Sequence, residues 1–258
     1  MSFNEKILAA AARNQTRTVL ALDLEDPDPS RLLKRSREII RDVKDLICAV
    51  KINRQLVLGL GLPTVADSIL KFAEDQDLPT IMDAKLNDVG HTNEFMARTY
   101  FNSGFDAVIA SPVVGWENGL DAVFADANSR RKGILLLTYM SNPGAEAFYS
   151  LVAKHGTDYR PIFEILTKLG MEWKAHGLIV GATRPQVISR VRQLAGVNLP
   201  IFSPGVGAQG GDPTLAINAG ATYLIVGRSI YASQNPRAAA MQVRMHDEHR
   251  GNMAALAQ

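Results

Sequence analysis

Two carboxylates flank one lysine in residues 80–92, which read Thr-Ile-Met-Asp-Ala-Lys-Leu-Asn-Asp-Val-Gly-His-Thr. Asp83 and Lys85 end an apolar run that predicts a buried β-strand, and Asp88 follows three residues later. A buried charge without a partner is costly, so these groups must pair or change protonation. A lysine held in this way can act as a fixed cation and as a proton donor. The alternative is an ordinary ion-pair cluster in a surface loop.

Charged residues also end two earlier strand-like runs. Asp23 lies within Leu-Asp-Leu, and Lys51 lies within Val-Lys-Ile. Side chains alternate across a strand, so we expect these two residues to share one face with Asp83 and Lys85, while their apolar neighbours take the other face. The pattern predicts one convergent charged cluster. Its alternative is a salt-bridged layer that serves only packing.

A second candidate group follows the last two strand-like runs. Residues 203–213 read Ser-Pro-Gly-Val-Gly-Ala-Gln-Gly-Gly-Asp-Pro, and Gly227 and Arg228 stand at the end of the run at 223–227. Glycine lets backbone N–H groups approach a ligand closely, and arginine presents a planar fork of donors that suits phosphate oxygens. Barrels of the α/β class often hold phosphate in the loops after strands seven and eight. We therefore predict a phosphate site here, although any single glycine also fits a plain turn.

Short apolar runs alternate with segments of helical spacing, a pattern typical of βα units around a parallel sheet. The predicted strands are 18–24, 46–52, 79–85, 107–111, 133–139, 177–180, 200–203 and 223–227. The predicted helices are 30–43, 62–73, 93–102, 116–127, 159–169, 185–195, 213–219 and 236 onward, with an additional helix at 4–13 before the first strand.

Eight such units predict one α/β domain over residues 1–258, a single (β/α)8 TIM barrel with an additional N-terminal helix. Asp28, Thr183 and Asp212 stand close before a proline and are candidate helix caps. The segment 140–176 is long for one connection and has room for two short helices. The tail from residue 241 is expected to continue the last helix and to fray.

The composition favours a small-molecule ligand. The chain has 258 residues, 28 basic and 26 acidic, with a net charge of +2, so no broad basic field supports a nucleic-acid partner. The sequence holds no apolar run long enough to cross a membrane and begins without a secretory signal, so we expect no membrane association and a cytoplasmic location. The five histidines show no metal-ligand spacing, and His246 and His249 are expected to be solvated.

These motifs together resemble the orotidine 5′-phosphate decarboxylase family, specifically its compact archaeal-type branch. The resemblance covers nearly the whole chain. It is carried by the following segments: Ala-Leu-Asp23-Leu, Val-Lys51-Ile, Asp83-x-Lys85-x-x-Asp88-Val-Gly-x-Thr92, Met140-Ser141-Asn-Pro-Gly-Ala, Pro204-Gly-Val-Gly-Ala-Gln209-Gly-Gly-Asp and Ile225-Val-Gly-Arg228-Ser-Ile-Tyr.

The resemblance implies decarboxylation of orotidine 5′-monophosphate to uridine 5′-monophosphate in pyrimidine biosynthesis, without metal or organic cofactor. It implies a homodimer in which Asp88 and Thr92 reach into the neighbouring subunit's site. The implied catalytic residues are Lys85, Asp83, Asp88 and Lys51. The implied substrate contacts are Asp23, Lys51 and Thr92 for the ribose, Ser141 for the pyrimidine, and Pro204, Gly207, Gln209, Gly227 and Arg228 around the phosphate.

Two other readings of the sequence stay open. A magnesium-dependent phosphosugar decarboxylase or aldolase shares Asp83, Lys85 and Asp88, but those enzymes typically place an acidic residue where this chain has Lys51. A nucleotide-binding barrel without catalytic activity would keep the phosphate loops alone. Asn93 and Asn142 lie within the motif segments and receive no role.

Overall fold

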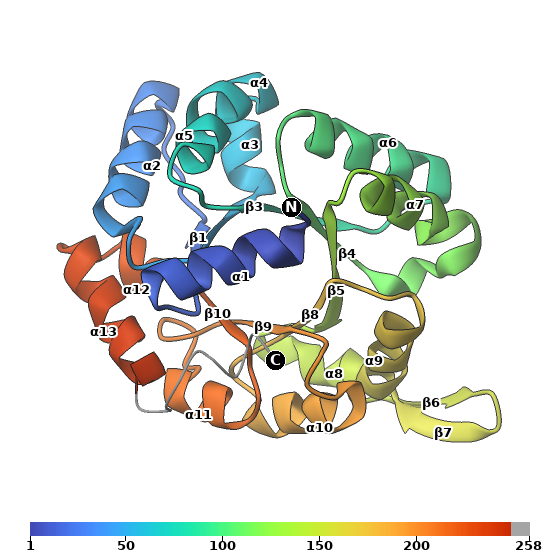
Figure 1. Ribbon diagram of the computed structural model, residues 1–258. Coiled ribbons are helices and arrows are strands. Elements are labelled where there is room, and N and C mark those ends of the chain that lie inside the picture. Colours follow the sequence, from blue (N-terminus) through green and yellow to red (C-terminus); the bar gives the residue numbers. More distant parts are fainter. Residues whose placement is uncertain (249–258) are drawn as a thin grey trace.

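Eight parallel strands close into a barrel in the computed structural model, which describes residues 1–248 (Figure 1). Around the barrel the order is β1-β10-β9-β8-β5-β4-β3-β2. These strands are β1 (Thr18–Leu22), β2 (Ala49–Asn53), β3 (Thr80–Leu86), β4 (Ala107–Ala110), β5 (Gly133–Tyr139), β8 (Gly177–Val180), β9 (Ile201–Pro204) and β10 (Tyr223–Val226). Each overlaps one predicted strand, so the predicted (β/α)8 barrel is confirmed.

Helices surround the barrel and connect its strands (Figure 1). They are α1 (Phe3–Asn14), α2 (Pro29–Val43), α3 (Arg54–Leu60), α4 (Leu62–Val65), α5 (Lys71–Glu74), α6 (Gly90–Asn102), α7 (Asp121–Ser129), α8 (Glu146–Tyr149), α9 (Ile162–Glu172), α10 (Pro185–Ala195), α11 (Pro213–Asn218), α12 (Arg228–Tyr231) and α13 (Pro236–Glu248). A π-helical turn at Ala66–Leu70 joins α4 to α5, so the predicted helix at 62–73 is one nearly continuous element.

The core has two layers, as strand alternation requires. Leu22, Ile52 and Met82 point outward and pack with the helices in one large apolar cluster. Ala21 and Ile81 point inward and belong to a smaller cluster that fills the barrel interior. Because side chains of successive residues take opposite faces, this register places the charged residues of β2 and β3 inside the barrel.

The predicted N-terminal helix is confirmed as α1, which lies across one end of the barrel (Figure 1). The Phe3 ring stacks on Phe202, which in turn stacks on Tyr223, with ring centroids 6.3 Å and 4.8 Å apart. Gly133 begins β5 directly beside this stack, and a Cβ atom there would lie 2.5 Å from the Phe3 ring. Glycine at this position therefore lets the helix plug the end of the barrel.

The long segment between β5 and β8 differs partly from its prediction. It contains the short helix α8 and the helix α9, but residues 159–161 are strand rather than helix. They belong to an antiparallel hairpin of β6 (Val152–His155) and β7 (Asp158–Pro161), which projects from the barrel in Figure 1. The helix α3 was also not predicted. The strands of the hairpin and the helix α3 are too short for a clear periodic signal in the sequence.

Two of the three predicted helix caps are confirmed. The Asp28 carboxylate accepts hydrogen bonds from the first turn of α2, and the Asp212 carboxylate accepts one from the Leu215 N–H in α11. The prediction for Thr183 is wrong, because its hydroxyl donates to the Ser141 carbonyl oxygen at 3.0 Å instead of capping α10. This bond joins two loops at the same end of the barrel.

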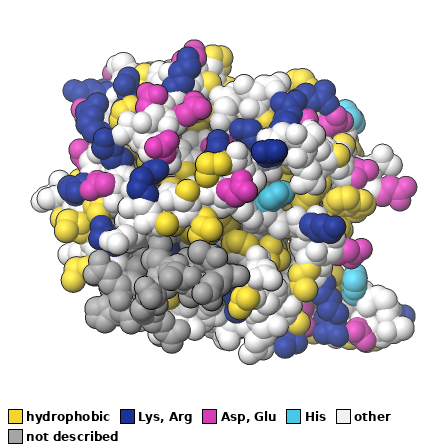
Figure 2. All heavy atoms as spheres, in the orientation of Figure 1, with side chains coloured by type: hydrophobic (Ala, Val, Ile, Leu, Met, Phe, Trp, Pro, Cys, Tyr) yellow, Lys and Arg dark blue, Asp and Glu magenta, His cyan; other side chains and the backbone are white. Residues whose placement is uncertain are grey.

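Basic and acidic side chains are interspersed over the face that carries α1, as Figure 2 shows, in keeping with the small net charge. Within residues 1–248, no single helix is long and apolar enough to cross a membrane. Arg54–Leu60 and Leu62–Glu74 would qualify only as a pair, and they are bent by 104°. The predictions for His246, His249 and the tail beyond residue 248 fall outside the side chains and residues that the structure describes.

Candidate active site

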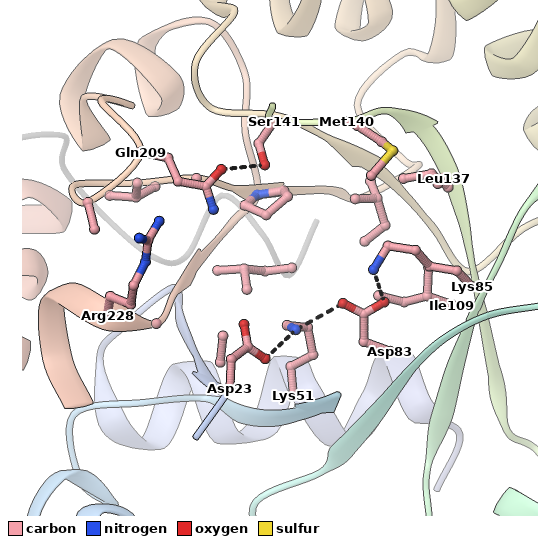
Figure 3. A pocket seen from close by; sticks show the side chains of 18 of the residues that line it. Asp23, Lys51, Asp83, Lys85, Ile109, Leu137, Met140, Ser141, Gln209 and Arg228 are labelled. Atoms are coloured by element: carbon pink, nitrogen blue, oxygen red, sulfur yellow. Dashed lines mark hydrogen bonds and ion pairs between the residues drawn. The ribbon is translucent and has the colours of Figure 1, made fainter. Parts of the chain in front are cut away.

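Four charged side chains form an alternating chain at the carboxyl ends of β1, β2 and β3. The Lys51 Nζ atom lies 3.0 Å from Oδ1 of Asp23 and 2.9 Å from Oδ2 of Asp83. The Lys85 Nζ atom lies 2.6 Å from the other Asp83 oxygen, Oδ1. Figure 3 shows these contacts side by side along one wall of a cavity. The predicted convergence of the four residues is therefore confirmed.

Burial and pairing act in opposite directions on the central two groups. Burial alone would lower the pKa of Lys51, but the carboxylates of Asp83 and Asp23 outweigh it and hold that pKa above its ordinary value. Burial would raise the pKa of Asp83, yet the ammonium groups of Lys51 and Lys85 hold it below its ordinary value. Both groups are thus charged at neutral pH.

The two lysines differ in what remains available to a ligand. The Lys51 side chain is only 6% exposed and already contacts two carboxylates, whereas the Lys85 side chain is 33% exposed and contacts one. Lys85 lines the cavity at the end of the charged chain. Of the two lysines, Lys85 therefore has more N–H bonds left to offer to a bound molecule.

The backbone of Lys85 is left-handed, with φ of +45°, inside a strand whose pairing with β4 shifts register between Met82 and Leu86. Such a bulge re-aims a side chain and is common beside active sites. A left-handed residue other than glycine is also strained. The local geometry of β3 is therefore less regular than simple strand alternation predicts.

The cavity has a volume of about 220 Å³ and combines this charged wall with an apolar one. Ile109, Leu137, Ile179 and Ile225 enter it from β4, β5, β8 and β10. Sequence analysis did not single out these residues, although their inward positions follow from alternation along each strand. Further lining residues that were not predicted are Ala21, Met140, Gly205, Val206, Ala208 and Tyr231.

Two of the predicted phosphate residues, Gln209 and Arg228, lie at the side of the cavity away from Lys85. Figure 3 shows Arg228 at that end and Gln209 above it. The Ser141 hydroxyl donates to Oε1 of Gln209 at 2.8 Å, so the loop after β5 contacts the loop after β9. Gly205, with φ of +94°, permits this approach, because a Cβ atom there would lie 2.8 Å from the Ser141 Cβ atom.

The other three predicted phosphate residues differ from one another in position. Pro204 and Gly227 line the cavity, but Gly207 does not. Gly207 has φ of +71° and faces Ser229, whose side chain would collide with any Cβ atom there. The Ser229 hydroxyl also accepts a hydrogen bond from the Ala208 N–H at 3.0 Å. Gly207 thus allows the loop to pack against Ser229 on the side away from the cavity.

Asp88 and Thr92 lie outside this cavity, at the start of α6. Asp88 is exposed, and its carboxylate accepts a hydrogen bond from the neighbouring Val89 N–H at 2.7 Å. Thr92 is partly exposed and lies in a shallow surface depression with Phe95. Within one subunit these two residues therefore do not join the charged chain.

Metal-ligating groups are not assembled in the described part of the chain. Among residues 1–248, no three or more His, Cys, Asp or Glu side chains lie together as a metal site would require. At the carboxyl ends of β1 to β3, the ammonium group of Lys51 lies between Asp23 and Asp83 and would repel a cation there. The absence of metal and organic cofactor from the reaction stays a prediction.

Fold and site together define a (β/α)8-barrel enzyme whose charged residues and glycine-rich loops meet at the carboxyl ends of the strands. The sequence profile described as "Orotidine 5'-phosphate decarboxylase / HUMPS family" matches residues 16–243. The chain belongs to this family.

Curated relatives and solved structures agree with that membership. The chain is 36% identical to an orotidine 5′-phosphate decarboxylase of Methanosarcina acetivorans, over 87% of this chain and 91% of the relative. It is also 36% identical to one of Pyrococcus abyssi, over 90% and 99%. The crystal structure of the Methanocaldococcus jannaschii enzyme, complexed with the inhibitor BMP, is similar with a TM-score of 0.75 and 32% identity, over 90% of this chain and 98% of that one.

Proposed function

We propose that the charged chain from Asp23 to Lys85 performs decarboxylation with Lys85 as the proton donor. The protein decarboxylates orotidine 5′-monophosphate to uridine 5′-monophosphate, a step of pyrimidine biosynthesis. The observation that carries the proposed mechanism is the position of Lys85, which ends a partly buried network of opposite charges and borders the cavity.

Loss of CO2 from pyrimidine C6 breaks the bond to the carboxyl carbon and leaves its electron pair on C6. The ring delocalises that pair poorly, so negative charge becomes localised in the transition state. A cation about 4 Å away contributes roughly 4 kcal/mol at an effective dielectric near 20. Lys85 supplies this charge, then gives one N–H proton to C6 and is reprotonated from solvent.

The apolar wall strengthens this effect. Ile109, Leu137, Ile179 and Ile225 line the cavity together with the charged residues. A pyrimidine ring packed against these side chains would exclude water from that side. Charges interact more strongly where water is excluded. The fixed charges and the apolar side of the cavity together stabilise the negative charge that a cofactor stabilises in other decarboxylases.

Asp83 has a second role in the proposal. Its carboxylate stays ionised because its pKa is held low by the two lysines. Placed beside the substrate carboxylate, it repels that group in the ground state, and the repulsion ends as CO2 departs. It also keeps Lys85 charged and oriented through the 2.6 Å contact.

The remaining substrate contacts follow the shape of the cavity. Asp23 and Lys51 bind the ribose hydroxyls, and Ser141 contacts the pyrimidine. Arg228 and Gln209 bind the phosphate, with Pro204, Gly227 and the backbone of the Gly207 loop around them. Ser141, the pyrimidine contact, donates a hydrogen bond to Gln209, a phosphate contact. Binding of the phosphate is therefore linked to closure of the Gln209 loop over the pyrimidine ring.

The proposal includes a homodimer in which Asp88 and Thr92 enter the neighbouring subunit's cavity. Two large apolar side chains near them, Val89 and Phe95, are exposed in the single subunit, Phe95 to 70%. Exposed apolar groups of this kind are typical of protein interfaces. Asp88 would then lie beside the partner subunit's Lys85, and Thr92 beside its ribose site. A single domain over residues 1–258 and a cytoplasmic location stay predictions.

An assay that follows the loss of orotidylate absorbance tests the proposed mechanism against its alternatives. We expect turnover by the purified protein, unchanged after exhaustive treatment with a chelator. Abolished turnover that magnesium restores would favour the metal-dependent phosphosugar type of site. Binding of uridine 5′-monophosphate without any turnover would favour a non-catalytic barrel.

A further inference from the structure

We infer that Asn93 is a positioning residue that acts on the reaction through Asp88. Asn93 is completely buried in the first turns of α6. Its Oδ1 atom accepts the Asp88 N–H at 3.1 Å, and its Nδ2 atom donates to the Asp88 carbonyl oxygen at 2.5 Å. One side chain therefore holds both polar backbone groups of the residue that carries the carboxylate.

The third bond of Asn93 ties this arrangement to another part of the fold. Its Nδ2 atom also donates to the Gly119 carbonyl oxygen at 3.1 Å, in the segment before α7. An asparagine side chain offers one acceptor oxygen and two donor hydrogens, so this buried amide is well matched to its three partners. No other natural side chain of this length offers the same set.

A close approach between two backbone segments supports the three hydrogen bonds of Asn93. Gly90 follows Asp88 by two residues, and a Cβ atom at Gly90 would lie 2.6 Å from the Asn118 carbonyl oxygen. The loop that carries Asp88 therefore rests directly on the backbone of residues 118–119, and Asn93 bonds across the same contact. By contrast, Val89 at the helix N-cap makes no capping bond through its side chain.

This inference rests on the proposed function, in which Asp88 enters the site of the neighbouring subunit. Asp88 reaches out from an exposed position, so its carboxylate depends on the backbone beneath it for direction. Fixing the N–H and C=O groups of one residue restricts the rotation of both flanking peptide planes. Asn93 in one subunit thus sets where a carboxylate lies beside the partner subunit's Lys85.

Hybrid dimers test this transfer between subunits. We expect Asn93→Ala to remain folded and dimeric and to lose at least tenfold in kcat. Mixing it with excess Lys85→Ala, which is inactive by itself, produces hybrids in which the intact Lys85 receives Asp88 from a subunit with an intact Asn93. Turnover per Asn93→Ala subunit should then rise to near the wild-type value per site.

A second mixture, of Asp88→Asn with excess Lys85→Ala, distinguishes failure of the inference about Asn93 from failure of the proposed role of Asp88. Recovery with Asp88→Asn but not with Asn93→Ala would overturn the inference and leave the proposed function standing. No recovery with either variant, or full activity of Asp88→Asn alone, would overturn the role of Asp88 itself. The double variant Asn93→Ala/Asp88→Asn should be no less active than Asp88→Asn, whereas an independent structural role would make the losses multiply.

Two further variants guard against simple loss of folding. Asn93→Ser keeps an uncharged polar group but is too short to bond both Asp88 and Gly119, so it should show the same loss of kcat and the same recovery in hybrids if Asn93→Ala is unfolded. Ala97→Gly weakens the buried middle of the same helix without touching Asp88. It should lower the Tm with kcat unchanged, and a matching loss of kcat would contradict the assigned role of Asn93.

Discussion

Lys85 contacts Asp83 through a 2.6 Å ion pair although only one residue separates them in the strand. The left-handed backbone of Lys85 and the bulge of β3 accompany this contact. A left-handed conformation costs a residue with a Cβ atom about 1–2 kcal/mol. Strain of this kind tends to be kept where a side chain must be aimed, and here it aims an ammonium group into the cavity.

Replacing that ammonium group should separate binding from chemistry. We expect Lys85→Ala to bind uridine 5′-monophosphate with nearly unchanged affinity and to lose at least 10⁴-fold in kcat, about 5 kcal/mol of transition-state stabilisation. Calorimetric titration and the absorbance assay measure the two quantities. Lys71→Ala, at an exposed lysine of a surface helix, is the matched control. Substantial remaining decarboxylation would refute the role of Lys85.

The phosphate assignment makes a different prediction for Arg228. Arg228→Ala should lower kcat/KM for orotidine 5′-monophosphate by roughly 100-fold, because truncating one side of a charge pair costs about 2–5 kcal/mol. The nucleoside orotidine has no phosphate to lose, so its kcat/KM should change by much less. Arg237→Ala, which removes an arginine paired with Asp45 on the surface, is the control. Equal losses on both substrates would argue against a phosphate contact.

The proposed dimer can be tested at Phe95. A carboxylate in an apolar interface is strongly unfavourable, so Phe95→Asp should yield monomers in sedimentation experiments and lose most activity with them. Leu215→Asp places the same charge on an exposed leucine of α11, on the opposite side of the barrel. That control should stay dimeric and active. An active Phe95→Asp monomer would show that no partner residue is required.

The lowered pKa of Asp83 predicts how stability depends on pH. An acid whose pKa is lower in the folded state than its ordinary 3.8 stabilises the fold above that pH, and the contribution is lost as pH falls through the folded value. At pH 7, Asp83→Asn leaves two lysines short of a partner and should lower the free energy of unfolding by about 3 kcal/mol.

Urea unfolding at pH 7 and pH 3 measures this difference. The gap between wild type and Asp83→Asn should be smaller at pH 3, where the carboxylate of the unfolded wild-type chain is mostly protonated. Asp75→Asn, at an exposed position, should stay within about 0.5 kcal/mol of wild type at both pH values. A gap of the same size at both pH values would contradict the stabilising role of Asp83.

The barrel and its charged cluster could be predicted from the sequence because both rest on local patterns. Strand alternation alone indicates that Asp23, Lys51 and Asp83 share the interior, and the glycines of residues 205–211 mark a loop of unusual backbone shape. Such signals need only a few consecutive residues. Neither the strand order nor a ligand has to be known to read them.

Contacts between distant segments were beyond sequence reasoning. Thr183 has the residue type and position of a helix cap, but the Ser141 carbonyl, 42 residues away, takes its hydroxyl. The hydrogen bond from Asn93 to Gly119, 26 residues away, likewise has no signal in the local sequence. The bulge at Lys85 depends on pairing with β4, and Gly207 packs against Ser229 instead of lining the cavity. In each case tertiary structure decides among locally equivalent choices.

The stacked rings of Phe3 in α1, Phe202 and Tyr223 have a consequence for how ligands reach and leave the cavity. They fill the far end of the barrel, so we expect the nucleotide to enter and leave at the carboxyl ends of the strands, near Gln209 and Ser141. In the proposed mechanism carbon dioxide forms beside Lys85, on the same side of these rings, so we expect it to leave at the same end of the barrel as the nucleotide.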